Sequence, residues 1–489
     1  MTAQQLWLDT LYILPEIIVT AVALLVFTWD FLRPKEQPVM LAAVSLLGLL
    51  IAMMFTVPQW GQEFIVFSKS IAVDYFSICL KFLTLSVTAF VIVISIPYFK
   101  KVDMWRGEYF VLLLFACVGI LLVGDGISLV TIYLGLELLA IPAYVLTAFM
   151  VHDERSSEAA MKYFLMGSLA SAIMVYGISL VYGITGQLNI YAIQDYIVKA
   201  GVKSDPALLV GVILLIAGFG FKIGAVPFHM WLPDVYEGAP TPITAYIATA
   251  AKIAPMAAVL RVFVVAVHPL SGHWMPVMAI LSALTMSLGN FLALKQENIK
   301  RMLAYSGITH IGYALMGIVA AGVSREMGVV SVVFYFIVYL ISNVGAFGVI
   351  IYICKEGGRW GDNYNDFKGL AKVSPLAAMV MSIFVMSMLG VPPTGGFMGK
   401  IWLFAAAIKT NMIWLAVVGV INAIISAYYY LRVMVMMYMH EPSPELMIEK
   451  EGAGLLAFML FVMAAITVYM GINPGVFYDL AYKSLTTLL

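Results

Sequence analysis

Long apolar runs separated by short polar segments recur along almost the whole chain, beginning at Leu11. Most runs reach about 20 residues, the length that an α-helix needs to cross roughly 30 Å of hydrocarbon. The pattern therefore predicts an all-α integral membrane protein of about fourteen transmembrane helices. We expect the helices near residues 11–32, 39–57, 71–97, 109–123, 127–149, 158–184, 206–230, 240–267, 274–294, 301–322, 327–354, 373–408, 412–438 and 453–471.

The composition agrees with a lipid environment. Of the 489 residues, 63% are hydrophobic and only 11% are charged, whereas a soluble domain carries roughly 25% charged residues. The 27 basic and 27 acidic residues balance, so no basic surface points to nucleic acid as a partner. No basic segment with a following cleavage site stands at the N-terminus, so we expect the first helix to remain.

The loops predict the orientation, because an even number of crossings places both termini on the same side of the membrane. Lys and Arg concentrate in cytoplasmic loops. Loops after odd-numbered helices carry fourteen cations, namely Arg33, Lys35, Lys100, Lys101, Arg106, Arg155, Lys295, Lys300, Arg301, Lys355, Arg359, Lys368, Lys372 and Lys450. The opposite face carries six, namely Lys69, Lys199, Lys203, Arg325, Lys409 and Lys483. Both termini are therefore predicted on the periplasmic side.

Two of the apolar runs are interrupted in the same manner, the seventh by Gly224-Ala-Val-Pro227 and the twelfth by Gly390-Val-Pro-Pro-Thr-Gly-Gly396. Proline removes a backbone donor, and the freed carbonyls are tolerated only where protein or a water-filled cavity surrounds them. The breaks lie five helices apart, and an odd offset inverts the second copy of a repeat. We expect two inverted five-helix repeats, helices 4–8 and 9–13.

This plan divides the chain into four parts. Residues 1–108 hold the first three helices, 109–267 the first repeat, 268–438 the second repeat and 439–489 the last helix.

Five ionisable residues stand in apolar surroundings: Glu137 in the fifth helix, Lys162 in the sixth, Lys222 before the first break, Lys252 in the eighth and Lys400 after the second break. Each costs about 2.5–3.5 kcal/mol at the bilayer centre on insertion scales, so each should face the bundle interior. A nearby carboxylate favours the ammonium form of a lysine, whereas burial alone favours the amine. An ion pair that forms and breaks can therefore switch proton affinity.

Plainer interpretations remain open for these charges. A buried Lys–Glu pair can simply hold two helices together, although four lysines cannot all pair with one glutamate. Lys162 lies near the start of its helix and can reach the cytoplasmic interface with its long side chain. Lys81, Arg261 and Arg432 are open to a similar interpretation.

Two histidines are candidate proton relays, because the unperturbed imidazole titrates near neutral pH. His229 follows Pro227, and His310 lies on the tenth helix, the repeat partner of the helix that carries Glu137. A hydrogen-bonded core histidine is the alternative for both. Cys79, Cys117 and Cys354 lie far apart on separate apolar runs, so no metal or redox cofactor is predicted in this chain.

Three stretches resemble the antiporter-like membrane subunits of respiratory complex I. They are Leu136-Glu137-Leu138 with Pro142-Ala-Tyr, the run from Phe221 to Pro242, and the run from Gln296 to Ser306. The length, the lysine on the twelfth helix and the Pro-Pro-Thr-Gly-Gly-Phe397 run are similar to the subunit N branch of that family. The resemblance covers nearly the whole chain.

The resemblance implies a proton-translocating subunit of an NADH:quinone oxidoreductase in the bacterial inner membrane. Its partners would be other membrane subunits, including another antiporter-like one, and peripheral redox subunits that hold flavin, iron–sulfur clusters and quinone. By resemblance, Glu137 and Lys222 form a pair, Lys252 is the central lysine, Lys400 is the exit-side group, and Lys162 matches a lysine of subunit N.

The sequence thus leads to one hypothesis with two rivals. In the first, a proton enters from the cytoplasm near Lys222, passes through water and His229 to Lys252, and leaves through Lys400, while Glu137 sets the affinity of the lysine. The second makes the chain a subunit of a multi-subunit sodium/proton antiporter. The third is a scaffold whose charges only lock helices and bind partner subunits.

Overall fold

A computed structural model describes residues 3–32, 38–102, 106–355, 362–443, 446–448 and 453–488 of the chain. Among them, thirteen helices are long and apolar enough to cross a membrane. Twelve are continuous: α2 (Leu14–Leu32), α3 (Pro38–Thr56), α4 (Tyr75–Val102), α5 (Glu108–Asp125), α6 (Leu129–Thr147), α7 (Glu154–Thr185), α9 (Pro206–Ile223), α13 (Ser271–Ala293), α14 (Ile299–Ala321), α15 (Arg325–Tyr352), α19 (Ile413–Met439) and α20 (Ala453–Ile472).

The thirteenth span, Thr241–Ala266, consists of α11 (Thr241–Ala248), α12 (Ala250–Val259) and the π-helix η2 (Leu260–Ala266). A further apolar segment is divided into α17 (Pro375–Leu389) and α18 (Gly395–Lys409), each of which is too short to span alone. With this divided segment, the prediction of an all-α membrane fold with about fourteen crossings is confirmed. Arg33, Lys35, Arg359 and Lys450, which contributed to the predicted orientation, lie outside the described residues.

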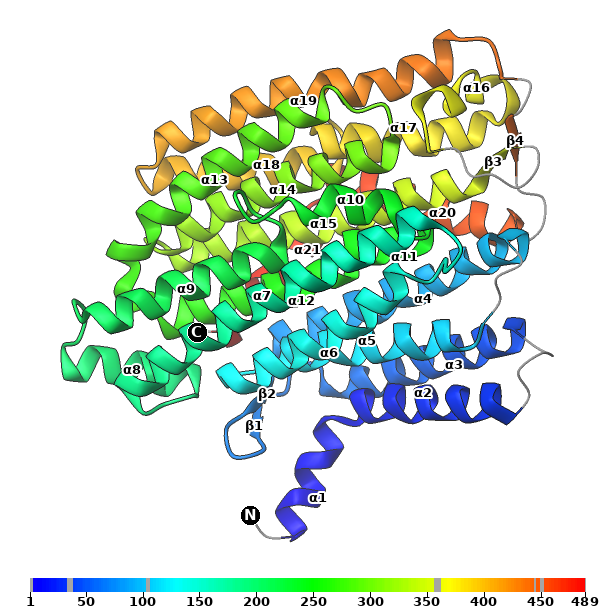
Figure 1. The fold of residues 1–489 in the computed structure, drawn as a ribbon. Coiled ribbons are helices and arrows are strands. Elements are labelled where there is room, and N and C mark those ends of the chain that lie inside the picture. The colour runs from blue at the N-terminus through cyan, green and yellow to red at the C-terminus, as the bar shows by residue number, and fades with distance from the viewer. Residues whose placement is uncertain are drawn as a thin grey trace.

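Shorter elements lie at the two ends of the helix bundle. Figure 1 shows the hairpin of β1 and β2 with α8 at one end, and the antiparallel pair of β3 and β4 with α16 at the other. The register pairs Phe64 with Val73 and Ile353 with Ile448. The short elements are α1 (Ala3–Tyr12), η1 (Val57–Gln59), β1 (Phe64–Val66), β2 (Ile71–Val73), α8 (Ile190–Ala200), α10 (Trp231–Gly238), η3 (His268–Leu270), β3 (Ile353–Lys355), η4 (Tyr364–Phe367), α16 (Leu370–Val373), β4 (Leu446–Ile448) and α21 (Gly475–Leu488).

Both predicted helix breaks are confirmed, and both begin at a glycine. α9 ends before Gly224, whose φ is 81°, and α17 ends before Gly390, whose φ is 88°. Such positive φ angles are strained for residues with a Cβ, which is why glycine closes a helix this way.

The eighth helix differs from the prediction of one continuous span. It breaks at Thr249, where φ is −127° and ψ is −83°. Pro255 lies inside α12 and cannot donate its backbone nitrogen to the preceding turn. Pro255 stands six residues beyond Thr249 and does not mark the position of the break.

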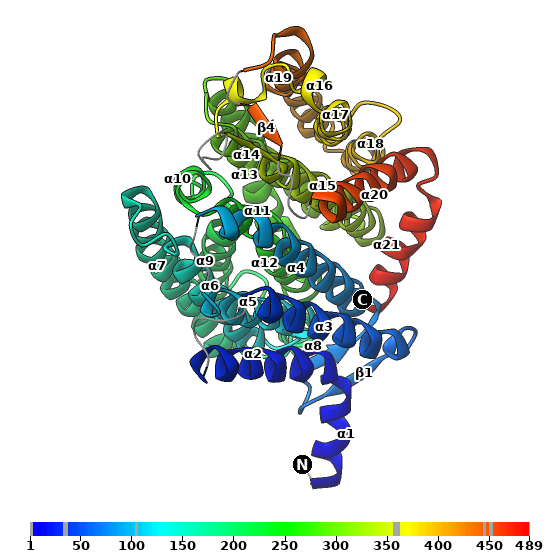
Figure 2. The ribbon, with the colours of Figure 1, turned by 90° about the vertical axis from the view of Figure 1, so that its right-hand side faces the viewer.

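The core of the bundle holds this broken span. Its residues are wholly buried, α14 and α15 are nearly so, and α2 and α20 are the least buried spans. Figure 2, an end view, shows α11, α12 and α15 in the middle, with α7, α2 and α19 at the periphery. Charged groups on the central helices are therefore shielded from lipid by other helices.

Candidate functional site: a buried lysine series

Glu137 and Lys222 form an ion pair between α6 and α9. The Lys222 ammonium lies 3.0 Å from Oε1 of Glu137, and the Ser171 hydroxyl on α7 donates to the same oxygen at 2.5 Å. The Lys222 side chain is 8% exposed and that of Glu137 21%. Hydrogen bonds to an ionised acceptor are stronger than neutral ones, so the arrangement favours the charged forms.

The end of α9 fixes the position of Lys222. Lys222 stands in the last turn of that helix, two residues before the left-handed Gly224. Helix C-termini favour positive charge, because the last carbonyls have no partner within the helix. The first break and the first lysine of the series are therefore one structural unit.

Among the described residues, Lys252 is buried without a carboxylate partner, since no acidic charge acts on its ammonium. Only 2% of the residue is exposed. The ammonium donates to the Tyr339 hydroxyl at 3.4 Å and lies 5.8 Å from the ring of Tyr236 and 5.6 Å from that of Tyr339. Aromatic faces attract cations at such distances, but they leave the charge uncompensated.

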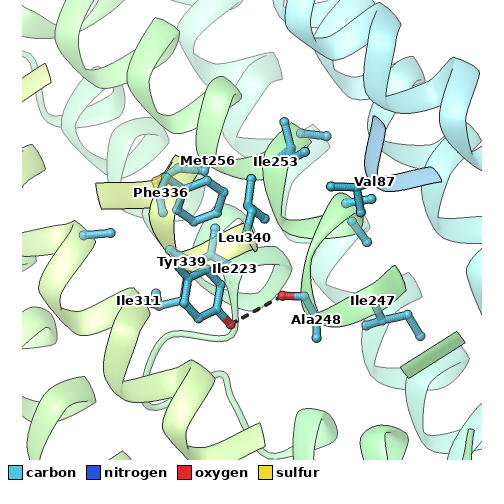
Figure 3. Close-up of a cluster of buried hydrophobic side chains, with 14 of the residues drawn as sticks. Val87, Ile223, Ile247, Ala248, Ile253, Met256, Ile311, Phe336, Tyr339 and Leu340 are labelled. Carbon is cyan, nitrogen blue, oxygen red and sulfur yellow. Dashed lines mark hydrogen bonds between the residues drawn. The ribbon is translucent and has the colours of Figure 1, made fainter. Parts of the chain in front are cut away.

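The break at Thr249 shapes this pocket. In a continuous helix the Lys252 N–H would donate to the Ala248 carbonyl, but here it donates to the Thr249 carbonyl at 3.0 Å. The Ala248 carbonyl instead accepts from the Tyr339 hydroxyl at 3.4 Å, as Figure 3 shows among apolar side chains that include Met256. The irregular backbone thus anchors the tyrosine that contacts the lysine.

Lys400 forms a hydrogen bond to the backbone at the second helix break. Its ammonium donates to the Leu389 carbonyl at 2.7 Å and lies 4.9 Å from the ring of Tyr313. In a continuous helix this carbonyl would accept from residue 393, but Pro393 has no N–H. Lys400 is 5% exposed, and no carboxylate charge from the described residues acts on its ammonium.

His310 lies near enough to Lys252 and Lys400 for the charges of both lysines to act on its ring. Nδ1 lies 2.5 Å from the Tyr335 hydroxyl and Nε2 lies 3.0 Å from the Tyr430 hydroxyl. Tyr430 also contacts the Ser306 hydroxyl. An imidazole with hydrogen-bond partners on both nitrogens can accept a proton on one side and give it up on the other.

His229 lies in the turn between α9 and α10 and is half-buried. Among the described residues, no hydrogen bond joins it to Lys222 or to Lys252. Its relay role remains a prediction.

Lys162 is not one of the buried lysines, since its side chain is 43% exposed. It pairs with Glu158 and with Asp234 of α10, both at 2.7 Å, and Arg301 pairs with Asp234 at 2.8 Å and with Glu237 at 2.7 Å. Burial alone raises the pKa of Asp234, but the hydrogen bonds and charges of Lys162 and Arg301 bring this pKa below its usual value. Asp234 is therefore ionised at neutral pH.

This charged cluster borders a cavity of about 280 Å³ at the end of α10, lined by Arg155, Glu158, Ala159, Lys162, Asp234, Glu237, Gly238 and Arg301. The long side chain of Lys162 explains where its ammonium lies. The aliphatic part stays along α7, while the ammonium reaches the charged cluster. The interpretation that Lys162 reaches the interface fits this geometry.

For Lys81 and Arg261 that interpretation is wrong, because both side chains are fully buried. Arg432 is half-buried and lies over the Tyr364 ring at 4.4 Å. The tyrosines around the lysines were not predicted from the sequence. Tyr335 and Tyr339 are four residues apart on α15 and so share one face, but aromatic residues at helical spacing are common in any apolar core.

The free thiols of Cys79 and Cys117 are buried. Among the described residues, no group of three or more His, Cys, Asp or Glu side chains is arranged to hold a metal ion.

Comparison with known proteins places these features in a family. Residues 127–426 match the family model described as NADH:quinone oxidoreductase/Mrp antiporter, TM. NADH-quinone oxidoreductase subunit N of Trichlorobacter lovleyi is 40% identical over 472 residues, which cover 96% of each chain. Subunit N of Thioalkalivibrio sulfidiphilus is 39% identical over 474 residues, 97% of this chain and 98% of the relative.

Solved structures show the same fold. A chain of respiratory complex I from Thermus thermophilus with bound aureothin aligns with a TM-score of 0.80 and 29% identity, over 95% of this chain and 98% of that one. A chain of the Mrp complex from Dietzia sp. aligns with a TM-score of 0.84, over 98% and 97% of the two chains, but at 21% identity. The second likeness concerns the fold alone.

The fold and the buried lysine series define an antiporter-like membrane protein. The chain belongs to the NADH:quinone oxidoreductase/Mrp antiporter family, in the branch whose members are named NADH-quinone oxidoreductase subunit N.

Proposed function

We propose that this chain is an antiporter-like membrane subunit of a complex I-type NADH:quinone oxidoreductase and that it conducts protons through Lys222, Lys252 and Lys400. The names of the relatives support the assembly. Quinone reduction in other subunits supplies the energy, and flavin, iron–sulfur clusters and quinone belong to those partners. The chain resides in the bacterial inner membrane, with both termini on the periplasmic side.

One observation carries the proposal: the first lysine of the series is paired with a carboxylate and the next two are not. A lysine beside Glu137 holds its proton tightly, and a buried lysine without a carboxylate releases it readily. Separation of the Glu137–Lys222 pair therefore lowers the proton affinity of Lys222. The proton then moves to Lys252 through water, with His229 as the relay.

The second half of the path runs through the tyrosine and histidine contacts. The Lys252 ammonium donates to the Tyr339 hydroxyl. Each ring nitrogen of His310 is hydrogen-bonded to a tyrosine hydroxyl. A proton given up by Lys252 reaches Lys400 by way of His310, and Lys400 releases it to the opposite side. The cavity beside Lys162 and Asp234 is the cytoplasmic mouth, where acidic and basic groups collect protons from water.

The two helix breaks support a repeat as the frame of this path. Both breaks begin at a left-handed glycine five helices apart, and each holds one lysine of the series. We assign residues 109–267 and 268–438 to the two inverted copies, flanked by residues 1–108 and 439–489. Broken helices of such repeats hold ion sites near the membrane midplane.

The test is proton pumping in membrane vesicles that carry the assembled complex with Lys222→Ala or Glu137→Ala. We expect electron transfer to persist in proportion to the assembled complex and the protons moved per electron to fall. Lys199→Ala is the matched control, because Lys199 is 79% exposed and, among the described residues, pairs only with Asp195 on its own helix. Normal pumping stoichiometry in both variants would defeat the proposal.

The two rival functions are separate outcomes of the same experiment. Sodium-dependent proton exchange without electron transfer would identify a sodium/proton antiporter subunit. Variants that assemble poorly, but pump normally once assembled, would identify a scaffold.

A further inference from the structure

A second group of buried charges lies away from the lysine series, where α2, α4 and α5 meet. The ammonium of Lys81 lies 2.9 Å from Oε1 of Glu16 and 2.9 Å from Oδ2 of Asp125. The side chains of Lys81 and Asp125 are 0% exposed and that of Glu16 is 4% exposed. Three helices thus bring one cation and two carboxylates into a buried site, which we call the Lys81 triad.

Two charged groups beside the triad form a separate, balanced pair. Arg261 of η2 lies 3.0 Å from Asp74 and also donates to the Gly124 carbonyl at 2.8 and 3.1 Å. Its charge is matched by Asp74, so it cannot balance a second carboxylate of the triad.

Other described elements packed around the triad add no compensating charge. α3 has no ionisable side chain, and Asp479 and Lys483 of α21, which packs against α4, are exposed. Besides Asp125, α5 carries the buried thiol of Cys117, on which the charge of Glu16 acts. Lys252 of α12 contacts Tyr236 and Tyr339 instead. With every group ionised, the triad would carry one net negative charge in a fully buried site.

An uncompensated buried charge is strongly unfavourable, and two carboxylates that share one site do not both ionise readily. We infer that the Lys81 triad is a proton-binding site that holds one proton at neutral pH, shared between Glu16 and Asp125 across the Lys81 ammonium. Binding converts one carboxylate to a carboxylic acid, which leaves one positive and one negative charge.

The triad joins the edge of the bundle to its centre. Glu16 lies in the first turn of α2, a peripheral helix, and Asp125 is the last residue of α5. The preceding residue, Gly124, accepts the hydrogen bonds of Arg261, which lies on the same broken span as Lys252. This proton site does not depend on the lysine series, and its assignment stands whether or not that series conducts.

Amide substitutions test the shared proton, because an amide mimics the neutral acid. If one carboxyl is already protonated, Glu16→Gln or Asp125→Asn alone leaves Lys81 with one carboxylate. We expect each single variant of the assembled complex to keep a thermal inactivation half-time within about twofold of wild type. The double variant leaves the Lys81 ammonium without a carboxylate and should inactivate about tenfold faster or more. The two substitutions are then non-additive, as expected for residues in contact.

Asp74→Asn is the positive control, because it removes the one carboxylate of Arg261 and should destabilise by itself. The triple variant with Lys81→Met should regain the stability that the double variant loses. Infrared difference spectra between wild type and each single variant should show the loss of a carbonyl band of a buried carboxylic acid. Single variants that are each destabilised, with an additive double variant, or a band that survives both substitutions, would overturn the proton site.

Discussion

The ammonium of Lys400 donates a 2.7 Å hydrogen bond to the carbonyl of Leu389, on the other side of the helix break. The carbonyl is free because Pro393 cannot donate to it. The helix break therefore supplies a hydrogen-bond acceptor for the buried Lys400 ammonium. Among the described residues, this acceptor stands in place of a carboxylate partner. Four predictions follow from this and the related contacts of the series.

Gly390→Ala should disturb Lys400 beyond its backbone strain. A Cβ at this position would lie 2.9 Å from Cδ of Lys400, and the φ of 88° is strained for alanine. The strain costs about 1 kcal/mol. Gly186→Ala, with a φ of 63° and no atom within 4 Å, carries similar strain and is the control. Pumping by the assembled complex should fall in Gly390→Ala and remain in Gly186→Ala; equal pumping would contradict the prediction.

Gly307→Ala should displace the head of Lys252. The new Cβ would lie 2.9 Å from the Lys252 ammonium and 3.0 Å from the Tyr339 hydroxyl. Both groups must move, so we expect pumping to decrease severalfold while electron transfer persists. Gly183→Ala is the control, because nothing lies within 4 Å of its Cβ and alanine stabilises a helix interior by about 0.5–1 kcal/mol. Unchanged pumping in Gly307→Ala would show that the space beside Lys252 is unimportant.

Replacement of the paired lysine by methionine should destabilise the protein more than replacement of the unpaired lysine. Lys222→Met leaves Glu137 without its cation and should cost about 1–3 kcal/mol, less than in a fully enclosed pair because Glu137 is 21% exposed. Lys252→Met removes a lone buried charge and should change stability by less than about 1 kcal/mol. Thermal inactivation of the complex in detergent measures both. Equal losses would mean that Lys252 has a carboxylate partner.

Ser171→Ala should act through Glu137 alone. The Ser171 hydroxyl donates to Glu137 Oε1 at 2.5 Å, and a hydrogen bond to a charged group contributes about 1.5–3 kcal/mol. We expect reduced pumping in Ser171→Ala, but no further reduction when the substitution is added to Glu137→Gln. Such a cycle isolates the coupling of the two residues. Additive losses would place the effect of Ser171 elsewhere.

Local signals found some of these features and missed others. The glycine and proline runs at Gly224 and Gly390 predicted two breaks, because both residues act on the backbone of their own turn. The break at Thr249 escaped prediction, since Pro255 stands six residues away and prolines inside membrane helices are often accommodated. Lys162 was predicted among the buried lysines, but its partner Asp234, which also pairs with Arg301, comes from a distant segment.

The amino-acid sequence alone determined the membrane environment, the number of crossings, the two glycine-led breaks and the family, because apolar length and backbone chemistry act within a single segment. Only the tertiary structure decided which charges meet. Glu137 and Lys222 are 85 positions apart, and the Lys81 triad joins residues of three helices. A buried charge is stabilised by whichever group packing brings within about 3 Å, and no local pattern encodes that partner.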